Sequence, residues 1–150
     1  MKEITENITT NTRVIKNLLT KYADTFKAFK VLINNSIQAD AKNIHINISY
    51  NDSLLFKSGI EKISIQDDGY GVPINEFKKR ILQIGTDVKD RGLGVGRFSA
   101  FQISEILNIE TVAFDKIENK FSRTVLEIDT TNLDDIELEK TDLKINFEYL

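Results

Sequence analysis

The feature that most constrains this chain is a short apolar strand that ends in an acid and runs into a glycine turn. Ile63, Ile65 and Asp67 alternate, so their side chains share one face of the strand, and the two isoleucines predict that this face is buried. A carboxylate on a buried face is costly unless hydrogen-bond donors reach it. Gly69 and Gly71 follow and leave the backbone free to turn and to approach a ligand closely. We expect Asp67 to form the floor of a pocket for an amino-bearing ring; the alternative is a plain Asp-Gly turn after a strand.

The size and composition indicate an ordinary globular domain. A length of 150 residues predicts one domain, residues 1–150, with a core of its own. The net charge is −3 and both signs are mixed along the chain, so no nucleic-acid-binding stripe is evident in this segment. The absence of cysteine excludes disulfides and zinc–thiolate sites. Without a signal peptide or a membrane-length apolar run, we expect a cytoplasmic protein with no membrane partner.

Two helices are predicted in the first part of the chain. Residues 1–10 read as a loose polar arm, and residues 1–22 as a whole are interpreted as a helical extension. A second helix is predicted over residues 24–39, and its apolar stripe is expected to face the core. The stripe consists of Phe26, Phe29, Ile33 and Ile37. Val31 and Asn35 fall nearly opposite this stripe, where they either line a cavity or belong to an exposed polar face.

Alternating apolar residues predict several strands. Residues 44–50 are expected to form a hairpin with the strand that ends at Asp67, and a helix is predicted over residues 74–84. Further strands are predicted over residues 106–114, 121–128 and 143–149. Thr124 is expected to place a hydroxyl on an inward, apolar face. The alternation still continues at Leu150, from which we expect the N-terminal piece of a longer protein.

A glycine-rich loop precedes the last group of strands. Gly92, Gly94 and Gly96 occupy alternate positions and lead into a helix-compatible run. Free backbone N–H groups and the positive end of a helix dipole suit phosphate oxygens. The alternative is a flexible linker.

Taken together, these motifs resemble the GHKL ATPases, the family of gyrase B, the ninety-kilodalton heat-shock chaperones, histidine kinases and MutL. The resemblance covers roughly residues 24–130 and includes the family's N box at residues 31–39, its adenine motif at residues 67–71 and its phosphate loop from residue 92 onward. The loop is closest to the chaperone, MORC and MutL branches. The resemblance implies an α+β fold, the Bergerat fold: a two-layer α/β sandwich with a mixed, mostly antiparallel sheet and helices on one face.

The same resemblance implies that ATP and Mg²⁺ bind the chain. Asp67 would accept the adenine amino group, Thr124 would support the adenine through a water, and Asn35 would ligate the metal. The phosphates would meet the glycine loop, and a lysine would cover the nucleotide. The nucleotide-binding residues expected in this way are Asn35, Asp67, Gly69, Gly71, Lys89, Gly92, Gly94, Gly96 and Thr124.

One departure from the family concerns the residue that activates the attacking water. The family places a Glu one helical turn before the metal-binding Asn, and this chain has Val31 there. The family's next acid is replaced by Gln38, and Asp40 lies off the pocket face, so no catalytic residue is expected and hydrolysis is predicted to be weak.

The resemblance therefore implies a nucleotide-dependent conformational switch in a larger chaperone/MutL-like protein. Its partners would be the nucleotide, downstream domains of the same chain and, in one arrangement, a second copy in a homodimer. The alternatives are an active ATPase that uses another base, a histidine-kinase-type catalytic domain, and an interaction module that binds no nucleotide.

Overall fold

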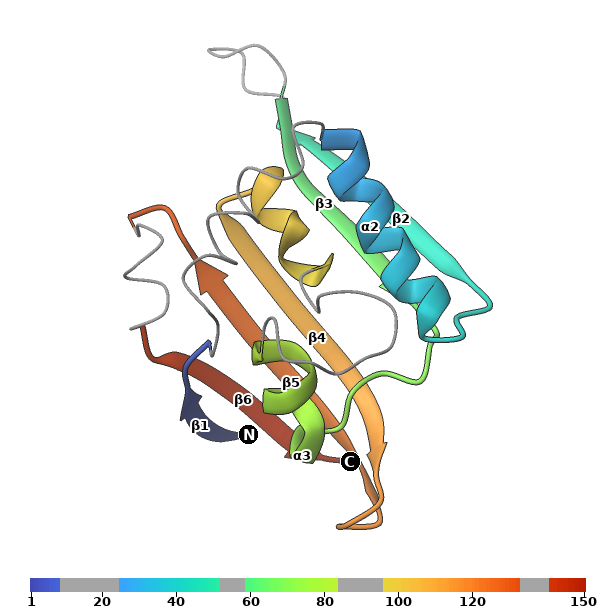
Figure 1. Ribbon diagram of the computed structural model, residues 1–150, viewed down its shortest axis with the longest axis vertical. Helices are drawn as coiled ribbons and strands as arrows, with labels where there is room; N and C mark the ends of the chain where they lie inside the picture. Colours follow the sequence, from blue (N-terminus) through green and yellow to red (C-terminus); the bar gives the residue numbers. More distant parts are fainter. Residues whose placement is uncertain (9–24, 52–58, 84–95, 133–140) are drawn as a thin grey trace.

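The computed structural model describes residues 1–8, 25–51, 59–83, 96–132 and 141–150 (Figure 1). The helical elements are α2 (Thr25–Gln38), the short α3 (Ile74–Phe77), a wide π-helical turn η1 (Lys78–Leu82) and a 3-10 helix η2 (Gly96–Gln102). The strands are β1 (Lys2–Glu6), β2 (Ile44–Asn51), β3 (Gly59–Asp67), β4 (Ile106–Asp115), β5 (Lys120–Asp129) and β6 (Leu143–Tyr149).

The strands form two antiparallel sheets, and the helices lie on one face of them (Figure 1). The larger sheet has the order β1-β6-β5-β4, and β2 and β3 form a separate hairpin. Every strand pair in the described parts of the chain is antiparallel. The predicted α+β fold with two layers is therefore confirmed, with its strands divided between two sheets.

The core lies between the helices and the inward face of the larger sheet. Alternate residues of β5 and β6 point inward, as their period-two patterns predict. They meet apolar residues of α3, η1 and η2. The buried cluster consists of Ile8, Phe77, Leu82, Phe98, Leu126, Ile128, Leu143 and Ile145.

The predicted loose arm at residues 1–10 is wrong for its first part, because Lys2–Glu6 form β1. This strand pairs with β6, with Lys2 opposite Phe147 and Glu6 opposite Leu143. Its side chains are almost all exposed, so it shows no buried face and no apolar alternation. An edge strand held by backbone hydrogen bonds needs neither. The helix expected over the rest of residues 1–22 lies outside the described residues.

The bounds predicted for helix α2 are confirmed, but the predicted apolar stripe faces inward only in part. Phe29 and Ile33 are half-buried, whereas Phe26 and Ile37 are 71% and 58% exposed. The buried residues of the helix are Ala28 and Ser36. The helix packs against η2, where Ser99 Oγ donates a hydrogen bond of 3.1 Å to the backbone oxygen of Ala28. The small side chain of Ala28 suits this close contact, and Ser36 faces β3.

The predicted strands at residues 44–50, 106–114, 121–128 and 143–149 are confirmed within a residue or two. The helix predicted over residues 74–84 is confirmed in part, since α3 changes into the wider turn η1 after Phe77. Within the described ranges, no helix is long and apolar enough to cross a membrane.

Candidate functional site

Helix α2 carries three of the residues that define the candidate site. Val31 and Asn35 are both half-buried, one helical turn apart, and so lie on the same side of the helix. Ser36 is 3% exposed, and its Oγ donates a hydrogen bond of 2.7 Å to Oδ2 of Asp67. Sequence analysis missed Ser36, although it directly follows Asn35 in the expected motif.

Asp67 ends β3 and is less buried than predicted. Ile63 and Ile65 are only half-buried, and Asp67 itself is exposed. The expectation of a buried carboxylate is therefore wrong, because a single helix, α2, covers this hairpin and Asp67 lies at the very end of the strand. Its carboxylate is nevertheless held from two sides, since the Gly69 N–H donates 3.0 Å to Oδ1 and Ser36 reaches Oδ2. The alternative of a plain turn does not account for the contact with α2.

Asp68, which sequence analysis did not single out, ties the same turn to the α2–β2 connection. The N–H groups of Lys42 and Asn43 donate to Oδ1 at 2.6 and 2.8 Å, and the Asn43 side-chain amide donates to Oδ2 at 2.8 Å. These donors, led by the Asn43 backbone N–H, lower the pKa of Asp68 from 3.8 to about 2. Two adjacent acids thus fix the turn, one to the helix and one to the loop that follows it.

Gly69 and Gly71 are required by close packing. A Cβ on Gly69 would lie 2.6 Å from the Cβ of Ala39. Gly71 has a φ of 63°, and a Cβ there would overlap the backbone oxygen of Val112 and approach Thr111 Oγ1 to 2.8 Å. The turn therefore packs closely against Ala39, directly after the end of α2, on one side and against β4 on the other. Their predicted role beside a nucleotide stays a prediction.

Thr124 lies on the inward face of β5, as predicted, and is fully buried. Its Oγ1 has no hydrogen-bond partner in the described parts of the molecule. Its cross-strand neighbour on β4 is Thr111, whose Oγ1 accepts 2.8 Å from the Val72 N–H. The turn that begins at Asp67 therefore contacts Thr111, the residue paired with Thr124 on the same face of the sheet.

The glycine loop falls largely outside the described residues. Lys89, Gly92 and Gly94 lie there, and Gly96 begins η2. The predicted helix after the loop is thus confirmed as a 3-10 helix, and it packs against α2. This contact brings the end of the predicted phosphate loop beside the helix that carries Asn35.

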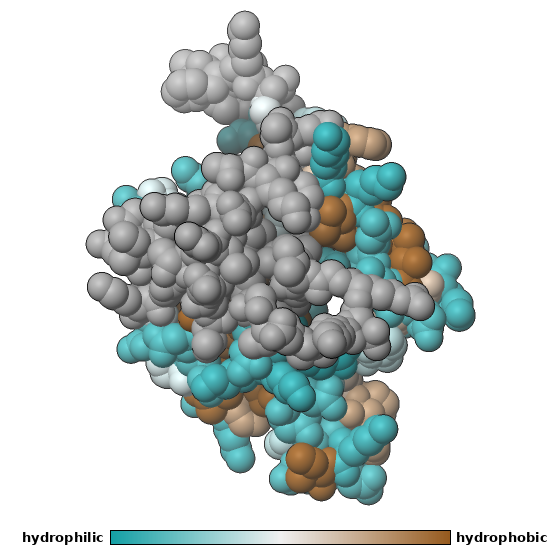
Figure 2. Space-filling view, in the orientation of Figure 1, coloured by the Kyte–Doolittle hydropathy of each residue, from teal (hydrophilic) through white to brown (hydrophobic). Residues whose placement is uncertain are grey.

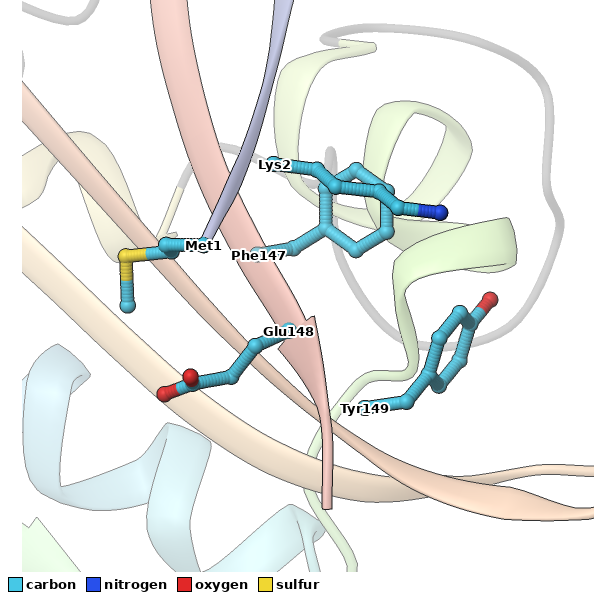
Figure 3. A pocket seen from close by; sticks show the side chains of 5 residues that line it. All are labelled: Met1, Lys2, Phe147, Glu148 and Tyr149. Carbon is cyan, nitrogen blue, oxygen red and sulfur yellow. The ribbon is translucent and has the colours of Figure 1, made fainter.

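A separate hollow lies at the β1–β6 edge and contains none of the predicted site residues. It is lined by Met1, Lys2, Phe147, Glu148 and Tyr149. Figure 3 shows the Lys2 stem lying across the Phe147 ring, with Tyr149 on the same side and with Met1 and Glu148 turned the other way. Because the hollow is shallow and its lining is mostly apolar, we assign no chemistry to it.

A family model described as "Histidine kinase-, DNA gyrase B-, and HSP90-like ATPase" matches residues 22–147. The match spans α2, the Asp67 turn, η2, strands β4 and β5, and β6 as far as Phe147. Searches of curated proteins and of solved structures gave no match.

Proposed function

The chain belongs to the family of histidine kinase-, DNA gyrase B- and HSP90-like ATPases, and on this premise we propose that it binds ATP with Mg²⁺ and acts as a nucleotide-dependent switch in a larger chaperone/MutL-like protein. The observation that carries the proposal is the Asp67 carboxylate, which α2 and the Gly69 backbone hold in one orientation while it stays accessible.

The residues around Asp67 suit the binding of an adenine ring. An ionised carboxylate has about four acceptor positions, and the Ser36 hydroxyl and the Gly69 N–H use two of those of Asp67. Among the described residues, these are the contacts that hold the side-chain carboxylate, and its other acceptor positions could receive the exocyclic amino group of adenine. The buried Thr124 hydroxyl, which lacks a partner among the described residues, supports a bound water or ligand atom nearby.

Binding of Mg²⁺ at the candidate site depends on Asn35. No group of three or more His, Asp or Glu side chains that could hold a metal occurs in the described residues. A single amide oxygen suits Mg²⁺, which keeps several waters and takes phosphate oxygens as its other ligands. Asn35 would thus hold Mg²⁺ only together with ATP, whose phosphoanhydride bond is the one broken in hydrolysis.

Hydrolysis is proposed to be weak because the side chain at the base position is aliphatic. Val31 shares the helix face of Asn35 but cannot accept a proton from a water molecule. Asp40 offers no substitute, since α2 ends at Gln38 and Asp40 adopts a φ of 58°, which turns the chain away from the helix. At this end of α2, the Tyr70 hydroxyl donates a hydrogen bond of 3.3 Å to the backbone oxygen of Gln38, the last residue of the helix.

The proposed switch rests on the contact between α2 and η2. A nucleotide at the glycine loop acts on the start of η2, and η2 is joined to α2 by the Ser99–Ala28 hydrogen bond. A nucleotide bound there would therefore change the surface that η2 and α2 offer to other domains.

Calorimetry with ATP in the presence and absence of Mg²⁺, followed by a phosphate-release assay on the same sample, tests the proposal. We expect binding that strengthens with Mg²⁺ and phosphate release slower than that of family members with a Glu at this place. The absence of both heat and a thermal shift would contradict the proposal and favour an interaction module. Rapid phosphate release would contradict the weak-hydrolysis part alone.

A further inference from the structure

Strand β2 is an edge strand that lacks the charged residues and proline that usually protect an edge, although its register shifts once near its end, between Ser49 and Tyr50. Among the described residues it pairs only with β3, and it lies at the outer side of the hairpin (Figure 1). Its eight residues, IHINISYN, include no Lys, Arg, Asp, Glu or Pro. Edge strands in monomeric proteins commonly carry such residues, which prevent pairing with another strand.

The edge is also bordered by exposed apolar side chains. Ile44 lies opposite Asp67, whose side chain contacts α2, so Ile46 and Ile48 lie on the same, helix-covered face of the hairpin. Because α2 packs on β3 and η2, these two side chains remain 45% and 39% exposed. Figure 2 shows hydrophobic surface on this side of the molecule, in the region of α2 and the hairpin. The other exposed apolar residues of these elements are Phe26, Ile37, Tyr50 and Ile60.

We propose that β2 pairs antiparallel with β2 of a second copy of this chain, about a two-fold axis at Asn47. The axis sets Ile46 of each copy opposite Ile48 of the other, and His45 opposite Ser49. Apolar side chains then meet apolar ones on one face and polar ones meet on the other. No two like charges of aspartate, glutamate, lysine or arginine face each other across the junction, since the strand has none.

The register of the hairpin is compatible with an axis at Asn47. The β2–β3 register is regular from Ile44 to Ser49 and shifts between Ser49 and Tyr50. An axis at Asn47 sets residues 45–49 of the two copies opposite one another, and all five lie in this regular stretch. An axis between two residues would set isoleucine against asparagine or serine, because opposite residues in an antiparallel pair share a face. The paired hairpins then form one sheet, β3-β2-β2-β3, with both α2 helices on the same face. This association requires no nucleotide.

The first experiment measures oligomeric state by sedimentation of the whole chain without nucleotide. We expect a wild-type dimer, a monomer for Ile46→Lys, and a dimer for the matched control Ile106→Lys. Ile106 is an isoleucine of β4 with nearly the same exposure, 46%, against 45% for Ile46. Circular dichroism verifies that both variants fold. A monomeric wild type would overturn the proposal and leave the edge to a strand of another protein. Equal loss of the dimer in both variants would also overturn it.

The second experiment uses the natural absence of cysteine, since a single introduced cysteine can cross-link only with a second copy. Residues opposite each other in an antiparallel pair have Cα atoms about 4.5–5.5 Å apart, which suits a disulfide. We expect Asn47→Cys to form a disulfide-linked dimer under mild oxidation, and Asn108→Cys, at an exposed position on β4, to remain largely monomeric on a denaturing gel. Equal cross-linking of both variants, or of neither, would contradict a two-fold axis at residue 47.

Discussion

Ser36 Oγ donates a 2.7 Å hydrogen bond to Oδ2 of Asp67, across 31 residues of sequence, and so joins the middle of α2 to the end of β3. Both residues belong to motifs that the sequence places far apart. The bond brings the predicted adenine acceptor next to the helix that carries the predicted metal ligand. This side-chain contact therefore helps to assemble the candidate site, together with the contacts of Asp68 and Tyr70 at the end of α2 and in the connection that follows it.

Removing this contact has a predictable double effect. Ser36→Ala should lower the free energy of unfolding by about 1–2 kcal/mol, the usual cost of a lost buried hydrogen bond, and should also weaken ATP binding because Asp67 loses its orientation. Urea unfolding and calorimetry measure the two effects. The control is Ser99→Ala, since Ser99 is another buried serine that makes one hydrogen bond to α2. Its loss should lower stability by a similar amount with a smaller effect on adenine binding. Identical binding losses in both variants would contradict a specific role for Ser36.

Asp67→Asn should reduce ATP affinity about 10- to 100-fold while the chain still folds. The amide replaces one acceptor oxygen by a donor, and a hydrogen bond to a charged group is worth about 1.5–3 kcal/mol. Calorimetry measures the affinity and thermal unfolding measures the fold. Asp129→Asn is the matched control, because Asp129 is likewise an exposed acid that accepts from a neighbouring hydroxyl and N–H, those of Thr131. An unchanged affinity in Asp67→Asn would exclude Asp67 as the adenine acceptor.

Val31→Glu should increase the rate of phosphate release from bound ATP by about 10²-fold or more, since general-base assistance typically contributes 10²–10⁴ in rate. Val31→Gln provides the control, because the side chain of Gln has nearly the same shape as that of Glu but cannot take up a proton from water. A phosphate-release assay under single-turnover conditions separates hydrolysis from binding. If Glu and Gln give the same rate, the missing base does not limit this chain.

The pH dependence of stability should carry the signature of Asp68. Its pKa is lowered from 3.8 to about 2 by the N–H donors of Asn43 and Lys42. A lowered pKa in the folded state means that the contribution of Asp68 is fully present above pH 3.8 and is lost as the pH falls through about 2. The difference in urea midpoint between wild type and Asp68→Asn should thus be constant near neutral pH and shrink between pH 4 and pH 2. A difference that stays constant down to pH 2 would assign the effect to something other than ionisation.

The sequence predicted the fold class and most element positions because the strands β4, β5 and β6 alternate in the usual way. It did not predict β1, whose exposed side chains carry no period-two signal. Hydrophobicity alone also misplaced part of the inward face of α2. Ala28 is buried where α2 meets η2, whereas Phe26, the first residue of the predicted stripe, is 71% exposed.

Of the candidate site, the sequence singled out Asn35, Asp67 and Thr124, whose roles stay predictions, and it misjudged the exposure of Asp67. Local periodicity reports which face of a strand is inward, yet it cannot report how far the covering helix extends over the strand's end. Asp68 and Thr111 were missed for a related reason, because their roles depend on donors from Asn43 and Val72, which are distant in sequence.

The hydrogen bond between Ser99 and the Ala28 carbonyl couples η2 to α2, and that of Ser36 couples α2 to β3. A displacement of η2 must either break the first bond or carry α2 along, and a displacement of α2 must either break the second or pull on the end of β3. A structural change at the adenine end of a bound nucleotide would therefore be transmitted through α2 to its phosphate end, and a change at the phosphate end to the adenine end.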